Sequence, residues 1–347
     1  TQTHRFFAEG KFYTPSGKAN FIAPARPELS VDLSVTYPLL LNTGRIRDQW
    51  HTMTRSGKSP RLGRHKEEPF LDINTADARK FHLTQGELAT VESPHGQAVL
   101  RVNLTDAQTP GDVFAPIHWT GQNASAGRIG ALLASHVDPF SGQPEAKAAP
   151  VSVKPFQAAF YGFVMSTASL DMTNCAYWAK VQLQDTIGYR FALTSYNGKG
   201  ANKWMSDLLG VSGTELIQST DKSNGVFRAA HLIDDRLQAV AYLSPQNDLP
   251  SWSWLETLFA KDKLEVLDRR YILAGRSIDG AQDPGPTVCA CYGVGRNTLI
   301  DAICKKGLIT TQALGEQLKA GTNCGSCLPE LRSLIGEHDK TAKAKAS

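Results

Sequence analysis

The chain has 347 residues, 41% of them hydrophobic and 20% charged, and its formal net charge is +4. This length suffices for roughly two or three domains with buried cores, and the basic residues are too scattered to indicate a nucleic-acid-binding protein. No run of about 18 apolar residues occurs, so we expect no transmembrane helix and no membrane association. The N-terminal TQTHRFFAEGKF also lacks the apolar segment of a secretory signal, which favours a cytoplasmic location.

The first segment, residues 1–155, is rich in short β-type runs separated by turns. Strands are expected over residues 37–43, 88–93, 97–103 and 112–119. The run LATVESPHGQAVLRV predicts a hairpin around Pro94, His95 and Gly96. One helix is expected within residues 74–83, with Asn74 as its N-cap. The basic run RSGKSPRLGRHK, residues 55–66, is interpreted as a solvated loop. This pattern predicts a β-barrel-like domain.

The middle segment, residues 156–280, mixes helical and strand patterns and predicts an α+β domain. Helices are expected over residues 202–210 and 253–262, the first ending at Gly210. The run VFRAAHLIDDRLQAVAYLS predicts a hairpin that turns at Asp234 and Asp235. No nucleotide-binding glycine motif occurs here, and the chemistry of this segment cannot be assigned from its residues.

The third segment, residues 281–337, begins with a linker-like run over residues 281–287. Its apolar spacing predicts three short helices, and a polar tail is expected to follow them. The predicted helices cover residues 296–307, 310–321 and 327–337, and the tail covers residues 338–347.

Four cysteines lie in this third segment as a Cys-x-Cys pair and a Cys-x-x-Cys pair. A structural zinc site is one interpretation, although zinc modules usually have gaps of about two to four residues in both pairs. A two-iron cluster fits a one-residue gap better, because each iron takes two thiolates and closely spaced pairs can serve separate irons. Gly293 and Gly325 permit backbone turns that aim N–H groups at sulfur.

The run CACYGVGRNTLIDAI…LKAGTNCGSCLPELRSLI resembles the bacterioferritin-associated-ferredoxin-like (BFD-like) [2Fe-2S] domain over about 50 residues. That resemblance implies a small all-α domain in which Cys289, Cys291, Cys324 and Cys327 hold a [2Fe-2S] cluster. Cys304, on the apolar face of a predicted helix, and the isolated Cys175 are expected to be buried core thiols.

The run NTGRIRDQWHTMTR, residues 42–55, combines guanidinium groups, hydroxyls and a tryptophan ring after a predicted strand. Arginine suits phosphate because its planar fork donates two parallel hydrogen bonds. From spacing alone, however, Trp-His-Thr is more often explained by core packing and a turn.

Residues 1–155 nevertheless resemble the C-terminal dinucleotide-binding domain of molybdopterin oxidoreductases. The resemblance includes GKFYTPSGKANF, TGRIRDQWHTMTR, EPFLDINTADA, FAPIHW and DPFSGQPEAKAAPVSV. It implies a double-psi-type β-barrel that holds part of a molybdenum bis(molybdopterin guanine dinucleotide) cofactor. The implied cofactor-binding residues are Thr43, Gly44, Arg45, Ile46, Arg47, Asp48, Gln49, Trp50, His51, Thr52 and Lys147. One departure is Gly130, which stands where the family often has an asparagine.

The pairing of these two domains resembles bacterial assimilatory nitrate reductases. It implies reduction of nitrate to nitrite with electrons from a flavoprotein, ferredoxin or flavodoxin. Such an enzyme also has an N-terminal [4Fe-4S] cluster and usually a protein ligand to molybdenum, and neither motif occurs here, so we expect a C-terminal portion. Catalytic residues cannot be named. The alternatives are a non-catalytic ferredoxin-like electron carrier and another bis-pterin enzyme such as a formate dehydrogenase.

Overall fold

The computed structural model describes residues 5–23, 28, 31–196, 198–277 and 283–345. The chain divides into two compact units, Thr1–Asp32 and Leu33–Ser347. The described residues of the first unit form turns, in which the ring of Phe7 stacks on that of Phe12 with centroids 4.9 Å apart. Part of the expected linker, residues 281–282, and the last two residues of the expected tail lie outside the described residues.

The second unit begins with six strands that close into a barrel in the order β1-β5-β2-β4-β3-β6. Their bounds are β1 Leu39–Gly44, β2 Phe70–Ile73, β3 Leu88–Ser93, β4 Gly96–Leu104, β5 Asp112–Pro116 and β6 Ala149–Pro155. Strand β1 is parallel to β5 and β2 is parallel to β4, whereas the other neighbours are antiparallel. The predicted barrel is therefore present, and β2 and β6 are the strands that the sequence did not reveal.

Short helices connect the barrel strands. Their bounds are η1 His51–Met53, η2 Ser56–Lys58, α1 Pro60–Gly63, α2 Thr75–Lys80 and η3 Ile129–Leu132. Asn74 caps α2 as predicted, because its Oδ1 accepts the Ala76 N–H at 2.8 Å. The interpretation of residues 55–66 as a solvated loop is wrong: the segment contains η2 and α1, and Ser56 is only 2% exposed.

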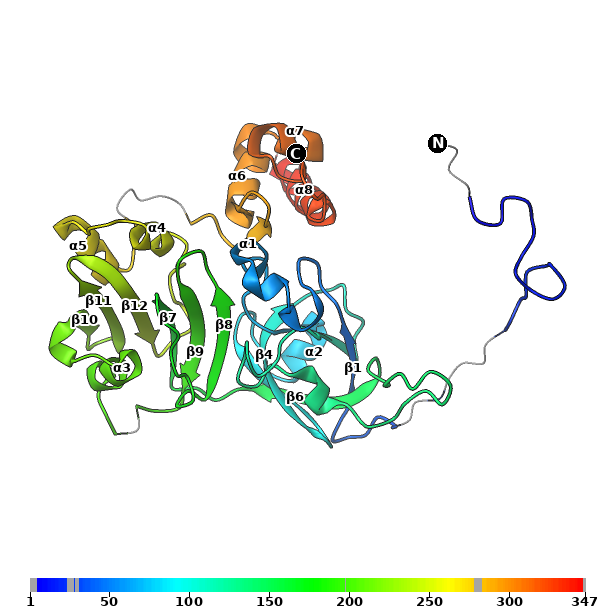
Figure 1. The fold of residues 1–347 in the computed structure, drawn as a ribbon, viewed down its shortest axis with the longest axis horizontal. Coiled ribbons are helices and arrows are strands. Elements are labelled where there is room, and N and C mark those ends of the chain that lie inside the picture. The colour runs from blue at the N-terminus through cyan, green and yellow to red at the C-terminus, as the bar shows by residue number, and fades with distance from the viewer. Residues whose placement is uncertain (1–4, 24–27, 29–30, 197, 278–282, 346–347) are drawn as a thin grey trace. The chain divides into compact units, whose positions relative to one another are not determined.

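A six-stranded antiparallel sheet follows, in the order β10-β11-β12-β7-β9-β8 (Figure 1). Its strands are β7 Phe160–Ser166, β8 Tyr177–Gln182, β9 Ile187–Leu193, β10 Leu216–Asp221, β11 Val226–Ile233 and β12 Arg236–Ser244. Its helices are α3 Ala201–Leu209, η4 Gly213–Glu215, α4 Leu255–Phe259 and α5 Val266–Ala274. The predicted hairpin is β11–β12, and its turn residues Asp234 and Asp235 have φ of 49° and 65°.

Both faces of this sheet are covered, because alternate residues of each strand enter different cores. Phe163 and Met165 of β7 pack in one core with residues of α4 and α5, whereas Val164 packs in the other with Trp204 and Met205 of α3.

Glu68 joins the barrel to this sheet. Its carboxylate accepts hydrogen bonds from Arg101 of β4 at 2.6 and 3.2 Å and from the Tyr177 hydroxyl of β8 at 2.9 Å. Arg190 of β9 lies 3.6 Å away. Burial alone would raise the pKa of Glu68, but the charges of Arg101 and Arg190 hold that pKa below its usual value. The carboxylate is therefore ionised and shared between the two parts.

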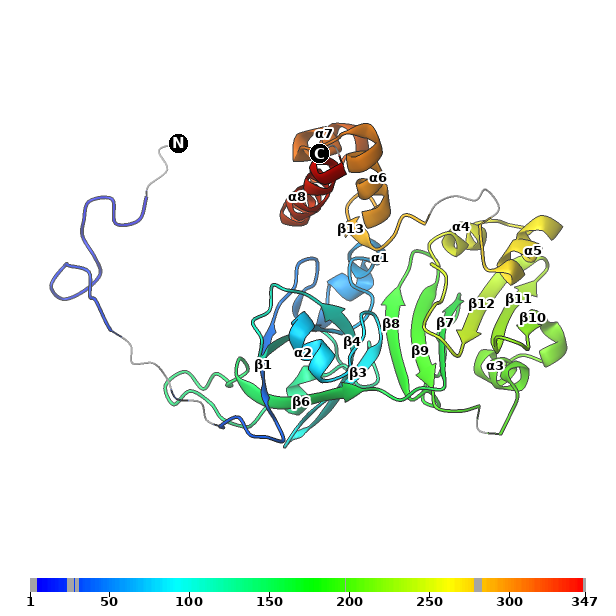
Figure 2. The same ribbon diagram turned by 180° about the vertical axis from the view of Figure 1, so that it is seen from behind.

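The last part of the chain forms a thiol module, residues 283–345, in which three helices pack together in both views (Figures 1 and 2). Its elements are β13 Thr287–Cys289, β14 Val294–Gly295, α6 Arg296–Lys306, α7 Thr311–Leu318 and α8 Leu328–Lys345. The two-stranded sheet means that the expected all-α description is not confirmed. The third predicted helix is also too short, because α8 continues to Lys345 instead of giving way to a tail. Among the described residues, no helix is long and apolar enough to cross a bilayer.

Candidate functional site

The end of β1 meets the segment that precedes β6. The Thr43 hydroxyl donates a hydrogen bond to the Ala146 carbonyl, and Lys147 Nζ donates one to the Thr43 carbonyl. Gly44 has little room for a side chain, since an added Cβ would lie 2.8 Å from the Phe114 ring and 3.8 Å from Lys147 Nζ. The structure therefore places Lys147 at the loop that follows β1, beside Thr43 and Gly44, across more than 100 residues of sequence.

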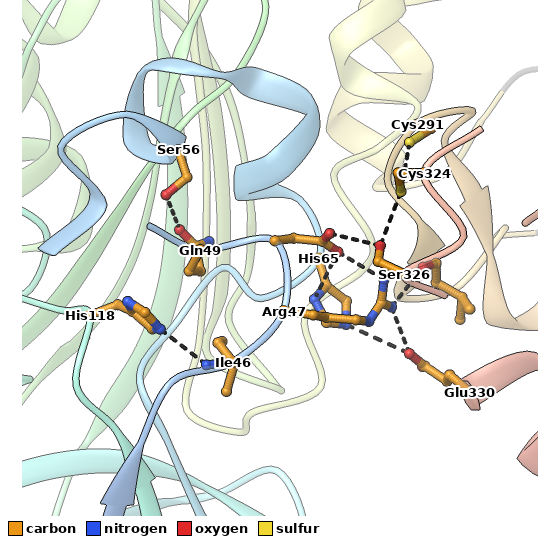
Figure 3. Close-up of polar contacts among 12 residues, drawn as sticks. Ile46, Arg47, Gln49, Ser56, His65, His118, Cys291, Cys324, Ser326 and Glu330 are labelled. Carbon is orange, nitrogen blue, oxygen red and sulfur yellow. Dashed lines mark hydrogen bonds and ion pairs between the residues drawn. The ribbon is translucent and has the colours of Figure 1, made fainter. Parts of the chain in front are cut away.

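His118 fixes the path of the loop that follows Gly44 (Figure 3). Its Nε2 accepts the Ile46 N–H at 3.0 Å, as drawn there. Its Nδ1 lies 3.0 Å from the Trp50 carbonyl oxygen. Because Nε2 is an acceptor, the ring is neutral and Nδ1 carries the proton that is donated to Trp50. Burial lowers the pKa of His118, which is fully inaccessible to solvent, and stabilises this neutral form. His118 thus has a structural role.

A second set of hydrogen bonds, made by Ser56, holds the same loop. The Ser56 hydroxyl donates to Gln49 Oε1 at 2.6 Å (Figure 3) and accepts the Trp50 N–H at 3.0 Å. Ser56 is buried, so these bonds are shielded from competition by water. Gln49 is therefore occupied with holding the loop.

Other predicted cofactor residues are exposed on this loop, namely Arg45, Trp50, His51 and Thr52. The Trp50 ring is 48% exposed, and the Arg55 guanidinium lies 5.2 Å from its centroid. Burial lowers the pKa of His118 most, and Arg45 and His51 add to this lowering, so both side chains lie near the His118 ring. Exposed cations, hydroxyls and a flat ring are suited to an anionic ligand that carries a planar ring system.

Arg47 points elsewhere, toward the thiol module (Figure 3), and Asp48 contacts the same module. Arg47 Nη2 donates to Glu330 Oε2 at 2.6 Å and to the Val288 carbonyl at 2.7 Å, while Nη1 donates to Asp48 Oδ2 at 2.8 Å. Asp48 Oδ1 accepts the Ser326 hydroxyl at 3.2 Å. Both residues are therefore occupied by contacts outside the exposed face of the loop.

His65 completes this junction. Its Nδ1 lies 3.4 Å from Asp48 Oδ2, and its Nε2 lies 3.7 Å from Glu330 Oε2. Glu330 has a lowered pKa: burial would raise it, but hydrogen bonds from His65 and Arg47 outweigh burial. The Glu330 carboxylate is therefore ionised where it meets Arg47.

The four predicted ligand cysteines lie together in the thiol module as free thiols. Cys291 Sγ and Cys324 Sγ are 3.3 Å apart, and Cys289 and Cys327 share a hydrogen bond. Each close pair thus takes one thiol from each sequence motif, whereas the sequence suggested that each motif serves one iron. Two thiolates bound to one tetrahedral metal by bonds of about 2.3 Å lie about 3.8 Å apart. The 3.3 Å between Cys291 Sγ and Cys324 Sγ is close to this distance.

The two thiol pairs differ in environment. Cys289 and Cys327 are buried, and burial followed by the charge of Cys289 raises the pKa of Cys327 to about 12. The pKa of Cys324 is lowered, mainly because the Ser326 side chain and backbone hydrogen-bond to its sulfur. Among the described residues, no three His, Cys, Asp or Glu side chains are grouped as a site for a metal ion. Two pairs of thiols are what a two-iron cluster requires.

The two remaining cysteines, both predicted as core thiols, have different outcomes. Cys304 is exposed, so its prediction as a core thiol is wrong: Leu299, Ala302 and Ile303 form the buried face of α6 without it. Cys175 is partly buried, and burial raises its pKa to about 12. Sequence reasoning missed Glu330, Ser326 and His65, because no local pattern indicates a partner that lies more than 200 residues away.

Comparison with known families assigns these two regions. Residues 39–150 match the molydopterin dinucleotide binding domain, and residues 287–337 match the BFD-like [2Fe-2S] binding domain. The chain therefore contains a molybdopterin dinucleotide-binding domain and a BFD-like [2Fe-2S] domain. The assignment of individual residues to either cofactor stays a prediction.

Similar proteins cover most of the chain. A nitrate reductase of Klebsiella oxytoca is 34% identical over 319 residues, which are 92% of this chain and 36% of that protein. A nitrate reductase of Shewanella frigidimarina is 26% identical over 384 residues, covering 98% of this chain and 39% of that protein. An F420-dependent formate dehydrogenase subunit alpha of Methanocaldococcus jannaschii is 28% identical over 144 residues, covering 42% of this chain and 21% of that protein. The chain thus spans less than half the length of these relatives.

Proposed function

We propose that the chain is the C-terminal part of a molybdenum-dependent assimilatory nitrate reductase. In this role it holds one dinucleotide of the molybdenum cofactor and carries electrons through its cluster. The observation that carries the proposal is the combination of a dinucleotide-binding barrel with a [2Fe-2S] module, in a chain similar over 92% of its length to a nitrate reductase. We further propose a cytoplasmic location and a flavoprotein, ferredoxin or flavodoxin as electron donor.

The exposed face of the loop after β1 fits the dinucleotide. Arg45 and Lys147 supply positive charge, His51 an imidazole ring, Thr52 a hydroxyl and Trp50 an exposed ring. The bonds from His118 hold the backbone of this loop in one shape before any ligand binds, which lowers the entropic cost of binding. Arg45 and Lys147 would neutralise phosphate charge, while the Trp50 ring would cover an aromatic face.

The thiol module fits a two-iron cluster. Cys291 and Cys324 would hold one iron, and Cys289 and Cys327 the other, in keeping with the two close pairs. The high pKa of Cys327 means that this thiol must lose its proton when metal binds, so cluster assembly should release protons. When bound, molybdenum supplies the chemistry that turns nitrate, two electrons and two protons into nitrite and water.

The module boundaries and the barrel type are part of the same proposal. We assign residues 1–155 to dinucleotide binding, 156–280 to the α+β part, 281–337 to the cluster and 338–347 to a terminal extension. A double-psi classification is supported by the closed barrel and its two parallel strand pairs. A [4Fe-4S] cluster outside this chain follows only from the resemblance.

The test uses the protein purified anaerobically from its own source, in whatever length it occurs there. Molybdenum, iron and released guanine nucleotide are measured, together with nitrite formation from nitrate using reduced methyl viologen. We expect all four, and a visible absorption spectrum whose [2Fe-2S] contribution is lost in Cys324→Ser. Nitrate-independent oxidation of formate would instead favour a formate dehydrogenase.

The electron-carrier alternative gives a different result in the same preparation. A carrier would show reversible reduction of the cluster without molybdenum and without released nucleotide. Zinc at the four thiols, with no visible chromophore, would exclude both the enzyme and the carrier.

A further inference from the structure

The loop that follows β1 touches both cysteine motifs of the thiol module. Arg47 bonds to the carbonyl of Val288, the residue directly before Cys289. Asp48 bonds to Ser326, which lies between Cys324 and Cys327 and whose Oγ is 3.1 Å from Cys324 Sγ. Two adjacent residues of one loop therefore reach both halves of the thiol cluster.

We propose that Arg47 and Asp48 are positioning residues that dock the thiol module onto the dinucleotide loop. They hold the cysteine motifs at a fixed place beside the residues that face the dinucleotide. The docking itself depends only on these contacts, whereas its value for electron transfer rests on the proposed function. This role is proposed for Arg47 and Asp48 in place of direct contact with the dinucleotide.

The contacts are those of a specific interface. Arg47 uses both terminal nitrogens on three oxygen partners, two of which belong to the thiol module. The Asp48 side chain is only 7% exposed, so its charge is largely removed from water, and it is satisfied by Arg47 and Ser326. Charge-assisted bonds in such surroundings contribute more than exposed ion pairs do.

Arg47 also acts on the cluster site electrostatically. Its positively charged guanidinium donates to the Val288 carbonyl at 2.7 Å, directly before Cys289, so its field acts at the cluster site. The same field stabilises additional negative charge on the cluster when it is reduced. Removing the Arg47 charge should therefore make the midpoint potential of the cluster more negative, an effect that a purely structural contact would not have.

The test is a double-mutant cycle on the full chain with its cluster in place. The single variants are Arg47→Gln and Glu330→Gln, and the matched control is Arg296→Gln with Glu337→Gln, an exposed pair within the module. Amide hydrogen exchange is followed in residues 45–50 and 324–330. Each Arg47–Glu330 single variant should raise exchange about tenfold, as expected for loss of a charge-assisted bond, and the double variant should raise it little further.

The potential provides an independent readout. Arg47→Gln should lower the midpoint potential of the cluster. Arg47→Lys should restore part of this potential, because lysine keeps the positive charge, but hydrogen exchange should stay raised, because lysine lacks the forked guanidinium. Unchanged exchange in both single variants, or effects equal to those of the control pair, would overturn the docking. A variant that does not fold is recognised because it loses the visible spectrum of the cluster. If Arg47→Gln does not fold, hydrogen exchange in Arg47→Lys tests the docking instead.

Failure of the proposed function is distinguishable from failure of the docking. Exchange and potential require neither nitrate nor molybdenum, so docking is tested even if the whole protein reduces another substrate. If wild-type protein forms no nitrite with reduced viologen, the proposed function fails while the cycle still reports on docking.

Discussion

Glu68 offers the sharpest test of what holds the barrel and the sheet together. The change is Glu68→Gln, which keeps the size of the side chain but removes the charge. The carboxylate receives two bonds from Arg101 and one from Tyr177, and its side chain is 11% exposed. Removing one partner of a buried ion pair costs about 3–5 kcal/mol, because the other charge is left uncompensated. Arg101 is also partly accessible to solvent, so we expect a loss of about 3 kcal/mol.

The assay is thermal and urea unfolding followed by tryptophan fluorescence, and Glu92→Gln is the matched control. Glu92 pairs with Lys154 on the barrel surface, where an ion pair is worth about 0–1 kcal/mol. At about 2–4 °C per kcal/mol, Glu68→Gln should lower Tm by about 6–12 °C and the control by less than about 4 °C. Equal losses in the two variants would refute the reasoning.

The pH dependence provides a second check on Glu68. Its pKa is lower in the folded chain than in the unfolded chain, so its contribution is complete above the unfolded value of about 4.3. That contribution is lost as the pH falls through the lowered folded value. The difference in unfolding free energy between wild type and Glu68→Gln should therefore be constant near pH 7 and shrink in strong acid.

Three further outcomes are expected. His118→Gln should lower the free energy of unfolding by about 1–3 kcal/mol, because one or both bonds to the loop are lost. Because the pKa of His118 is lower in the folded chain, the free energy of unfolding of the wild type should fall as the pH drops below about 6.5. The fall should be smaller in His118→Gln. Denaturant titrations at several pH values would measure both. Gly44→Ala should cost about 1–3 kcal/mol by crowding and weaken nucleotide retention, whereas Gly121→Ala, which has open space, should change neither in the same assays. Cys304→Ser should leave the iron content unchanged, whereas Cys324→Ser should reduce it; a loss of iron in Cys304→Ser would contradict the ligand assignment.

Features with a local cause could be predicted from the sequence. The β11–β12 hairpin turns where two aspartates occupy left-handed positions, and α3 ends at Gly210 with φ of 67°. Both depend on residues within one turn of chain, where side-chain chemistry restricts the backbone directly. The four cysteines could be found because their spacing is itself the signal.

Features that depend on distant partners could not be predicted. Arg47 was assigned to the dinucleotide by its motif, yet its contacts come from Val288 and Glu330, more than 240 residues away. Cys304 lies at the edge of the apolar face of α6. The sequence of one helix does not show whether a residue at that edge is buried by a neighbouring segment or left exposed. In both cases the packing of another segment decides the outcome.

A single left-handed residue explains how one short loop can face two partners. Asp48 has φ of 67°, a conformation that costs a non-glycine residue about 1 kcal/mol or more. The reversal lets Arg47 and Asp48 face the thiol module while Arg45 and Trp50 remain exposed. Glycine would adopt this turn without strain, but it would remove the carboxylate that receives Arg47 and Ser326. Asp48→Gly should therefore relieve the backbone yet undock the module, so that exchange rises in residues 324–330; unchanged exchange there would show that the backbone turn alone maintains the contact.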